Sequence, residues 1–261
     1  MTKALILAAG QGKRLRPLTN DKPKCLVSLL GKSLLEQQIN TLRKCGIKDI
    51  QIVTGYLKEQ IENLGISTSF NSRFETSNMV VSLFSSQPFL EKDNDDLIIA
   101  YGDIVYERKN LESLLACNDE MALMIDKEWR KLWSSRFENP LDDAETLLMD
   151  QNNFVMELGK KTDTFEKIHG QYTGLIKIRG DKIDNFIKFY KSLNQSASYD
   201  GRDFNNMYMT SLIQLLINYK WKVKAVLVSN GWLEVDSIED LSVYESMAKE
   251  GTLENFYKVE K

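Results

Sequence analysis

The chain is poor in the residues that many metal centres and nucleophilic sites require. It has one histidine, His169, and three cysteines, Cys25, Cys45 and Cys117, among 261 residues. A single histidine argues against a histidine pair or a histidine-centred triad, so we expect His169 to face solvent or to form a hydrogen bond. The cysteines are odd in number and widely spaced, which suggests neither a disulfide framework nor a zinc site. Reduced thiols are therefore expected.

An excess of one charge and long apolar runs are also missing. There are 34 basic and 37 acidic residues, for a net charge near −3, so no global attraction to nucleic acid or to an anionic membrane is expected. No apolar run reaches the roughly 18 residues of a membrane-spanning helix, and the amino terminus lacks a signal-peptide pattern. The sequence thus predicts a cytoplasmic globular protein with no nucleic-acid partner and no membrane insertion, in which any anion binding is local.

What the sequence does contain is an alternation of strand and helix patterns. Residues 3–8 and 49–54 are short apolar runs that predict strands. Between them, apolar residues recur at helical spacing over 35–42, Ser33 is placed as an N-cap, and Gly46 is placed as the left-handed residue that follows a helix. A strand, a helix and a strand in this order form a βαβ unit, whose right-handed crossover makes the two strands parallel neighbours.

The alternation continues along the chain. Helices are predicted over 56–64, 79–86, 109–116, 182–193, 203–219 and from about 238, and strands over 67–70, 95–101, 121–125, 146–150, 154–158, 171–178 and 222–229. This order predicts an α/β fold with a Rossmann-like, doubly wound mixed sheet. We expect a single domain, 1–261, whose core is formed by about 1–126 and 203–261. About 127–202 are predicted to form an inserted small β-rich region.

The stretch LILAAGQGKRL runs from an apolar strand into two glycines and two cations. Gly10 and Gly12 allow backbone N–H groups to approach a phosphate closely, and Lys13 and Arg14 supply the countercharge. The Walker pattern requires four residues between its glycines and a Ser or Thr after the lysine, which excludes a standard P-loop. The dinucleotide fingerprint requires a third small residue where Leu15 stands, which disfavours NAD binding.

Four segments in this order resemble the nucleoside-triphosphate transferase family. They are Leu7–Leu15 (LAAGQGKRL), Lys22–Lys24 (KPK), Gly102–Asp103 and Gly231–Asp236 (GWLEVD). The family loop usually has Thr or Ser before its arginine, where this chain has Lys13. The resemblance implies the nucleotide-diphospho-sugar transferase type of fold, in which the core binds the nucleotide and the insertion binds a phosphorylated acceptor. It also implies transfer of a nucleotide to an acceptor phosphate with release of pyrophosphate.

Such a transfer depends on positioning and charge neutralisation and needs no nucleophilic Ser, Cys or His. We expect Arg14, Lys24 and Lys13 to be the catalytic cations, and Asp103 and Asp236 to hold Mg²⁺. Each residue also has a plainer interpretation. Asp103 would suit a turn, Asp236 an N-cap, and the cations a solvated surface.

Within the family, the chain is similar to small cytidylyltransferases that act on phosphocholine, 2-aminoethylphosphonate or related compounds. The segments that carry this likeness are 71–78 (NSRFETSN), 82–83 (SL), 138–145 (ENPLDDAE), 159–161 (GKK) and 170–174 (GQYTG). The likeness implies CTP as donor, with the backbone of 8–10 near the base and 101–102 near the ribose. The predicted nucleotide-binding residues are Leu7, Ala8, Ala9, Gly10, Gly12, Asn78, Ser82, Tyr101 and Gly102. Relatives often have two asparagines where this chain has Ser77–Asn78, so Ser77 has no assigned role.

The inserted region is expected to select the acceptor. The predicted acceptor-binding residues are Trp129, Trp133, Glu145, Lys160, Tyr172 and Gly174. The aromatic members, with an acidic wall of Asp142, Asp143 and Glu145, would suit a cationic head group, and Lys160 and Lys161 would suit a phosphate. The plainer interpretation is that the tryptophans are core residues and that the charged residues face water.

Together with the resemblance, which alone implies CTP, these patterns lead to the hypothesis of a Mg²⁺-dependent cytidylyltransferase. It would couple CTP to a small phosphorylated acceptor, such as phosphocholine, aminoethylphosphonate or a phosphoglutamine-like compound, for bacterial surface polysaccharide or lipid modification. A monomer or a homodimer is expected. Two alternatives stay open: a sugar-1-phosphate uridylyl- or thymidylyltransferase, and a non-catalytic nucleotide-sensing domain.

Overall fold

Strands and helices alternate along residues 1–259, which are the residues described by the computed structural model. The strands are β1 (Thr2–Leu7), β2 (Ser28–Leu29), β3 (Lys32–Ser33), β4 (Ile50–Thr54), β5 (Ser67–Phe70), β6 (Asp96–Tyr101), β7 (Ile104–Tyr106), β8 (Met121–Asp126), β9 (Glu145–Met149), β10 (Val155–Lys161), β11 (Gln171–Ile178), β12 (Ser198–Tyr199), β13 (Arg202–Asp203), β14 (Val223–Val228) and β15 (Trp232–Glu234). The helices are α1 (Leu34–Lys44), α2 (Glu59–Glu62), α3 (Met79–Ser85), α4 (Gln87–Leu90), α5 (Arg108–Leu115), α6 (Trp129–Arg136), α7 (Ile183–Ser192), α8 (Met209–Asn218) and α9 (Ile238–Glu250). Within 1–259, none of these helices has the length and apolar character needed to cross a membrane.

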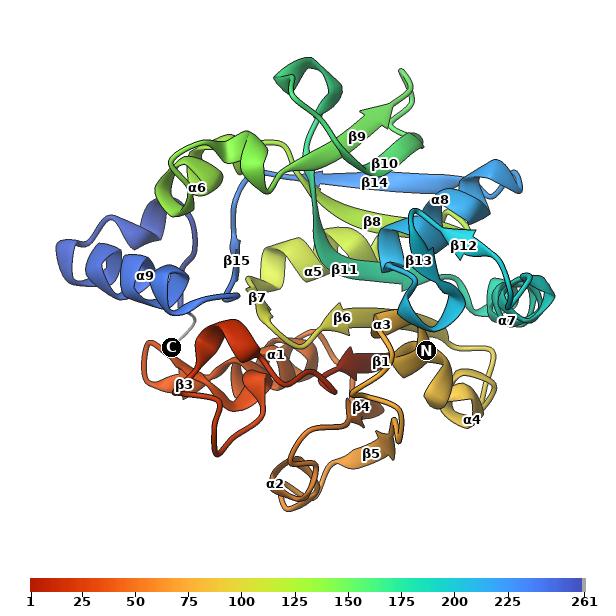
Figure 1. Cartoon of the computed structure of the whole chain (residues 1–261), viewed down its shortest axis with the longest axis horizontal. Helices are drawn as coiled ribbons and strands as arrows, with labels where there is room; N and C mark the ends of the chain where they lie inside the picture. Colours follow the sequence, from red (N-terminus) through yellow and green to blue (C-terminus); the bar gives the residue numbers. More distant parts are fainter. Residues whose placement is uncertain (260–261) are drawn as a thin grey trace.

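The central sheet of the described chain has seven strands in the order β14-β8-β11-β6-β1-β4-β5 (Figure 1). β1 pairs in parallel with β4 and β6, β4 with β5, and β14 with β8. β11 is antiparallel to both of its neighbours, β6 and β8. The predicted mixed α/β sheet is therefore present.

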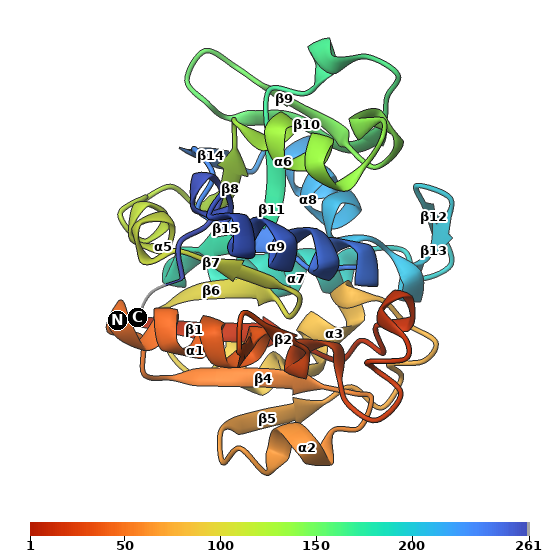
Figure 2. The same cartoon turned by 90° about the vertical axis from the view of Figure 1, so that its left-hand side faces the viewer.

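Alternate residues of the central strands face two separate hydrophobic cores. In β1, Ala4 and Ile6 belong to one core, and Leu5 and Leu7 belong to the other. This alternation follows from the two-residue period of a strand that is covered on both faces. Helices α1, α5, α6 and α9 cover the first face, and α3, α4, α7 and α8 cover the second. Figure 2 shows α6 and α9 on the side of the molecule that faces the viewer.

The region predicted as an insertion, 127–202, differs from the expectation in two ways. β11 lies inside the central sheet, and α7 contributes to the core on its second face. In addition, 129–136 form helix α6, which the charged sequence around it did not indicate. The separate β structure of this region is the hairpin of β9 and β10, above the sheet in Figure 1, together with the small strand β12.

Two predicted helices are shorter than expected. Of 56–64, only Glu59–Glu62 are α-helical, because Leu57 has a left-handed φ of 48° that is incompatible with a helix starting there. Of 203–219, residues 204–206 form a 3₁₀ turn, and α8 begins at Met209 after an extended Tyr208. The helix predicted between Ser33 and Gly46 is confirmed, since the Ser33 Oγ accepts the Glu36 N–H and Gly46 has a φ of 82°.

The carboxyl ends of the parallel strands bring several loops to one edge of the sheet. The segment after β1 starts at Ala8, and the segment after β6 contains Asp103. Because β11 runs in the opposite direction, its amino end, with Tyr172 and Gly174, reaches the same edge. The segment Gly231–Asp236 is held at this edge by the antiparallel pairing of β15 with β7, in which Glu234 is opposite Ile104.

Candidate functional site

The glycine loop that follows β1 packs directly on Lys24, the last residue of the Lys22–Lys24 segment. Gly12 has a φ of 62°, and a Cβ added to it would lie 2.9 Å from the Cβ of Lys24. The Thr19 hydroxyl donates to the Gly12 carbonyl oxygen at 2.8 Å, which fixes the turn. A positive φ and this contact both require glycine at position 12, so the loop and Lys24 are positioned by each other.

A cavity of about 330 Å³ opens between this loop and the ends of β1 and β6. Its lining residues are Leu7, Ala8, Ala9, Gly10, Gly12, Lys13, Arg14, Lys24, Cys25, Phe74, Ser77, Asn78, Met79, Ser82, Tyr101, Gly102, Asp103 and Asp236. The structure thus brings together all the residues that the sequence assigned to the nucleotide, to the catalytic cations and to the metal. The residues that the sequence did not assign are Cys25, Phe74, Ser77 and Met79.

One wall of this cavity is formed by residues from 74–82, and Asn71 supports it from behind. Asn78 caps α3 by accepting the Met79 N–H, and its own N–H is held by the Asn205 carbonyl oxygen at 2.9 Å. The buried Asn71 side chain donates to the hydroxyls of Ser77 and Ser82, at 3.1 and 3.0 Å. Ser77 therefore has a structural role in the wall as well as a place in the lining.

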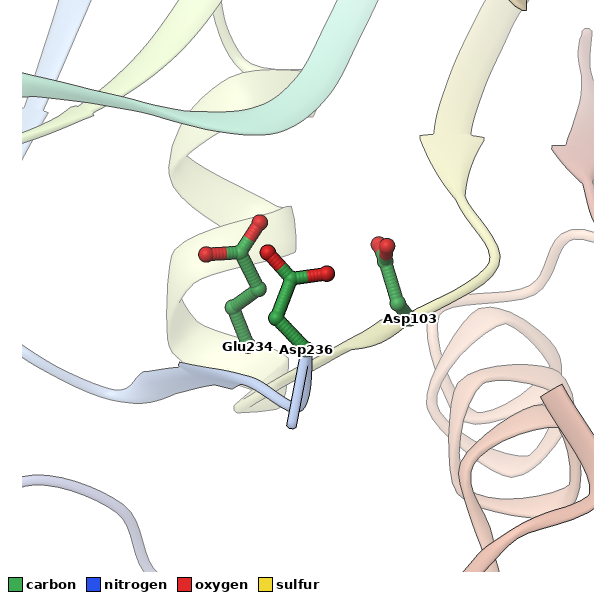
Figure 3. A group of neighbouring side chains, drawn as sticks. All are labelled: Asp103, Glu234 and Asp236. Atoms are coloured by element: carbon green, nitrogen blue, oxygen red, sulfur yellow. The ribbon is translucent and has the colours of Figure 1, made fainter. Parts of the chain in front are cut away.

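Three carboxylates lie close together beside the cavity (Figure 3): Asp103 and Asp236 line it, and Glu234 lies next to them. Asp103, Glu234 and Asp236 each offer an oxygen within 4.8 Å of the others. The β7–β15 pairing explains their proximity, because it continues to a hydrogen bond of 3.0 Å from the Val235 N–H to the Asp103 carbonyl oxygen. Clustered carboxylate oxygens are the donor set that hard divalent cations prefer.

One oxygen of this cluster is available for a ligand. Asp103 Oδ1 is buried and has no hydrogen-bond partner among the described residues, while Asp103 Oδ2 accepts from Lys24 Nζ at 2.7 Å. A buried carboxylate oxygen without a partner is costly, and a bound cation removes that cost. The residues present therefore fit a divalent metal ion.

Two cations face these carboxylates. Lys24 forms ion pairs with Asp103 and Asp236, and Arg14 Nη2 lies 3.0 Å from Asp236 Oδ2. Burial lowers the pKa of Lys24, but the two carboxylates outweigh it, so the pKa lies above its usual value and the ammonium stays charged. Burial tends to raise the pKa of Asp236, but Lys24 and Arg14 hold it below its usual value. Lys13 lines the same cavity from the glycine loop.

Glu234 is the member of the cluster that the sequence interpretation missed. Burial, followed by the neighbouring Asp236 charge, raises the pKa of Glu234 above its usual value, although the Arg136 guanidinium opposes this shift. The spacing of two residues between Glu234 and Asp236 was a usable signal, because alternate residues of an extended segment share a face.

None of the six predicted acceptor residues is in the lining of this cavity, but Tyr172 and Gly174 contact Tyr101, which is. Tyr172 stacks edge-on against Tyr101, with ring centroids 5.7 Å apart, and Gly174 leaves room for the Tyr101 ring, which a Cβ would meet at 2.7 Å. Burial, followed by the charge of Tyr172 and then of Asp103 and Glu145, raises the pKa of Tyr101. Tyr101 is therefore within electrostatic reach of both Asp103 and Glu145.

Glu145 is mostly buried at the start of β9, and this burial raises its pKa. Lys160 is exposed and forms an ion pair with Glu157, whereas Lys161 donates to the Asp142 carbonyl oxygen at 2.9 Å. A role of Glu145 in acceptor binding therefore stays a prediction.

Trp129 and Trp133 do not form the expected aromatic wall. Both are 4% exposed in the core under α6, where Trp133 packs on Trp232 and Trp129 packs on Phe165. The helical spacing of the two tryptophans places both on the buried face of α6. The plainer interpretation of these residues therefore holds.

Comparison with known proteins places the chain among enzymes of one class. The nucleotidyl transferase family matches residues 3–127. A CTP:phosphoglutamine cytidylyltransferase from Campylobacter jejuni is 42% identical over 248 residues, which are 92% of this chain and 98% of that protein. A 2-aminoethylphosphonate cytidylyltransferase from Lancefieldella rimae is 36% identical over 174 residues, 66% of each chain. The solved structure of CTP:phosphocholine cytidylyltransferase from Streptococcus pneumoniae shares the fold, with a TM-score of 0.72, 24% identity, and coverage of 95% of this chain and 99% of that one.

Proposed function

Because the chain belongs to the nucleotidyl transferase family, we propose that it is a cytidylyltransferase that couples CTP to a small phosphorylated acceptor and releases pyrophosphate. The observation that carries this proposal is the convergence of a glycine loop, three cations and the carboxylates of Asp103 and Asp236 on one cavity, with the Glu234 carboxylate next to those two. The relative that is similar over nearly the full length of the chain acts on CTP and phosphoglutamine, which supports CTP as the donor.

In the proposed reaction, an oxygen of the acceptor phosphate attacks the α-phosphorus of CTP. A new oxygen–phosphorus bond forms, the bond between the α-phosphorus and the β-bridging oxygen breaks, and pyrophosphate leaves. Both reactants are anions, so the site must supply positive charge where they meet. Arg14, Lys13 and Lys24 line the cavity, and we propose that Arg14 and Lys13 bind the leaving phosphates and that Lys24 stabilises charge at the α-phosphate.

Asp103, Glu234 and Asp236 are the residues that would hold the metal ion, and we propose Mg²⁺. When bound, such an ion neutralises phosphate charge and orients the reacting oxygens. The carboxylates would hold that ion, and in the structure the Lys24 ammonium forms ion pairs with two of them. Lys24 therefore also limits the repulsion among the acids.

The acceptor side favours a compound that carries a positive charge. The Gln171 side chain donates to the Glu145 carbonyl oxygen, and the next residue, Tyr172, packs on Tyr101 of the cavity lining. An acid near aromatic rings suits an ammonium group. Phosphoglutamine, aminoethylphosphonate and phosphocholine all have such a group. The product would be a CDP-linked donor for bacterial surface polysaccharide or lipid modification, made in the cytoplasm.

The decisive experiment measures pyrophosphate release from CTP, UTP, dTTP and GTP with each of the three acceptors, phosphoethanolamine and sugar 1-phosphates. We expect turnover with CTP and an acceptor that carries an ammonium group. Asp103→Asn should lower turnover on the order of 1000-fold with an unchanged fold by circular dichroism.

Turnover with UTP or dTTP and a sugar 1-phosphate would instead identify a sugar-nucleotide enzyme. Nucleotide binding without turnover on the whole panel would identify a sensor. Full activity of Asp103→Asn would contradict the proposed metal site.

A further inference from the structure

Arg136, at the end of α6, is a buried cation behind the carboxylate cluster. Its side chain is 1% exposed. Nε and Nη2 donate to the two oxygens of Asp240 at 2.8 and 3.1 Å, and Nη1 donates to Glu234 Oε2 at 3.1 Å. This bidentate geometry is the strongest form of the arginine–carboxylate contact.

Asp240 extends this contact to the backbone that carries Asp236. Asp240 Oδ2 also accepts the N–H groups of Asp236 and Ser237, at 2.9 and 3.0 Å. The Ser237 hydroxyl in turn accepts the Asp240 N–H, which completes a capping box at the start of α9. Arg136 is therefore one hydrogen bond from the Glu234 carboxylate, and two from the backbone of Asp236 through Asp240.

The charges explain why a cation is needed at this position. Asp103, Glu234 and Asp236 form the cluster, and Asp240 lies directly behind it. Lys24 and Arg14 line the cavity and are the cations that a triphosphate would engage. Arg136 is not among the cavity residues, so its charge stays with the acids when the nucleotide binds. Buried carboxylates without a partner would repel each other and move apart or become protonated.

We propose that Arg136 is a positioning residue for the metal site, which holds Glu234 and Asp236 in the arrangement that binds a divalent cation. The proposal rests on the proposed function insofar as that function requires a metal ion. Arg136 lies on α6, in the predicted acceptor region, and would thus support the carboxylates of Glu234 and Asp236 near the carboxyl-terminal end of the chain. Residues that support metal ligands in this way contribute strongly to metal affinity.

The test measures the affinity of the protein for Mn²⁺ directly, with electron paramagnetic resonance as the readout, in the presence and absence of CTP. The measurements are made well below the unfolding temperature of each variant. Arg136→Met removes the charge and the hydrogen bonds at similar length, and Arg136→Lys keeps the charge but loses the bidentate fork. Arg130→Met is the matched control, because Arg130 lies on the same helix but packs on the Phe165 ring at 3.7 Å. Thermal unfolding of every variant is measured in parallel.

We expect the dissociation constant for Mn²⁺ to rise by about 10- to 100-fold in Arg136→Met and by a smaller factor, about threefold or more, in Arg136→Lys. At saturating Mn²⁺, the KM for CTP should stay near that of the wild type, since Arg136 does not line the cavity. Arg130→Met should bind Mn²⁺ like the wild type.

Wild-type Mn²⁺ affinity in folded Arg136→Met overturns the proposal, as does equal weakening in Arg130→Met. If Arg136→Met does not fold, unchanged affinity in Arg136→Lys overturns it. A wild type that binds no Mn²⁺, with or without CTP, also overturns it. A wild type that binds Mn²⁺ in an Arg136-dependent way but turns over no acceptor leaves this inference in place, while the proposed function fails.

Discussion

At the scale of single residues, the site depends on the absence of a side chain at Gly12, which leaves room for Lys24. Gly12 needs a left-handed backbone, and the space that its Cβ would occupy is filled by the stem of Lys24. The Lys24 ammonium then reaches both Asp103 and Asp236. A change at position 12 therefore acts on the carboxylates through Lys24.

Gly12→Ala should lower stability and turnover together. The left-handed backbone costs about 1 kcal/mol for alanine, and displacement of Lys24 should lower kcat/KM at least about tenfold. Gly65→Ala is the control, because Gly65 has a φ of 70° but nothing within 4 Å of an added Cβ. Urea denaturation and pyrophosphate release compare the two variants. Equal turnover in both would show that the contact with Lys24 is unimportant.

Glu145 is the residue at which stability and ligand binding should conflict. Burial raises its pKa, so its ionised form is penalised in the folded state at pH values above that raised pKa. Glu145→Gln should therefore raise the melting temperature at pH 7 to 8 by about 2 °C and increase the KM for the acceptor. The gain should shrink as the pH falls and vanish below the unfolded pKa of about 4.3, where both side chains are neutral.

The measurement is thermal unfolding from pH 4 to 8, with Glu245→Gln as the control at an exposed position of α9. A surface change of this kind should alter stability by less than about 0.5 kcal/mol. A stability gain for Glu145→Gln that persists unchanged at pH 4 would point to a cause other than ionisation.

At the scale of elements, the start of α9 links helix stability to the site. Ser237 caps this helix, and the Asp240 carboxylate of the same capping box holds the Asp236 backbone N–H. The β7–β15 pairing enters from the other side and fixes Val235 opposite Asp103. The position of the Asp236 side chain is therefore decided by a helix cap and a strand pair together.

Ser237→Ala should cost about 1 kcal/mol of stability, as expected for the loss of an N-cap. Ser33→Ala at the start of α1 is a matched control, because the Ser33 hydroxyl also accepts an N–H three residues later, at 3.1 Å. We expect similar losses in denaturant titrations but a several-fold lower kcat only in Ser237→Ala. Identical kcat values in the two variants would show that the Ser237 cap has no effect on the site.

At the scale of the whole molecule, nucleotide binding should stabilise the fold. The cavity is bounded by segments from 7–14, 74–82, 101–103 and Asp236, so a bound nucleotide would tie together distant parts of the chain. A ligand at 100 times its dissociation constant adds about 2.7 kcal/mol to the free energy of unfolding.

CTP with Mg²⁺ should therefore raise the melting temperature by about 5 °C or more, and UTP, dTTP, ATP and GTP should raise it less. Differential scanning fluorimetry at one nucleotide concentration makes this comparison, and Asp103→Asn tests how much of the shift depends on the metal site. A larger shift with UTP or dTTP would favour the sugar-nucleotide alternative.

Much of the core and of the cavity could be predicted from the sequence, because these features depend on local patterns. Apolar runs specify the central strands, and a strand that runs directly into a turn places that turn at an edge of the sheet. Leu7, Gly12 and Asp103 all follow from this logic, and each lines the cavity. The family and the α/β fold predicted from these segments are confirmed by the comparisons.

Other features were decided only by contacts between distant parts of the chain. The place of β11 between β6 and β8 depends on long-range pairing, and an apolar run alone does not specify its partner. The burial of Trp129 and Trp133 depends on the unpredicted helix α6, which packs them in the core. Glu234 and Arg136 acquire their roles only when β15, α6 and α9 meet, because a carboxylate or a guanidinium has no specific partner until the fold supplies one.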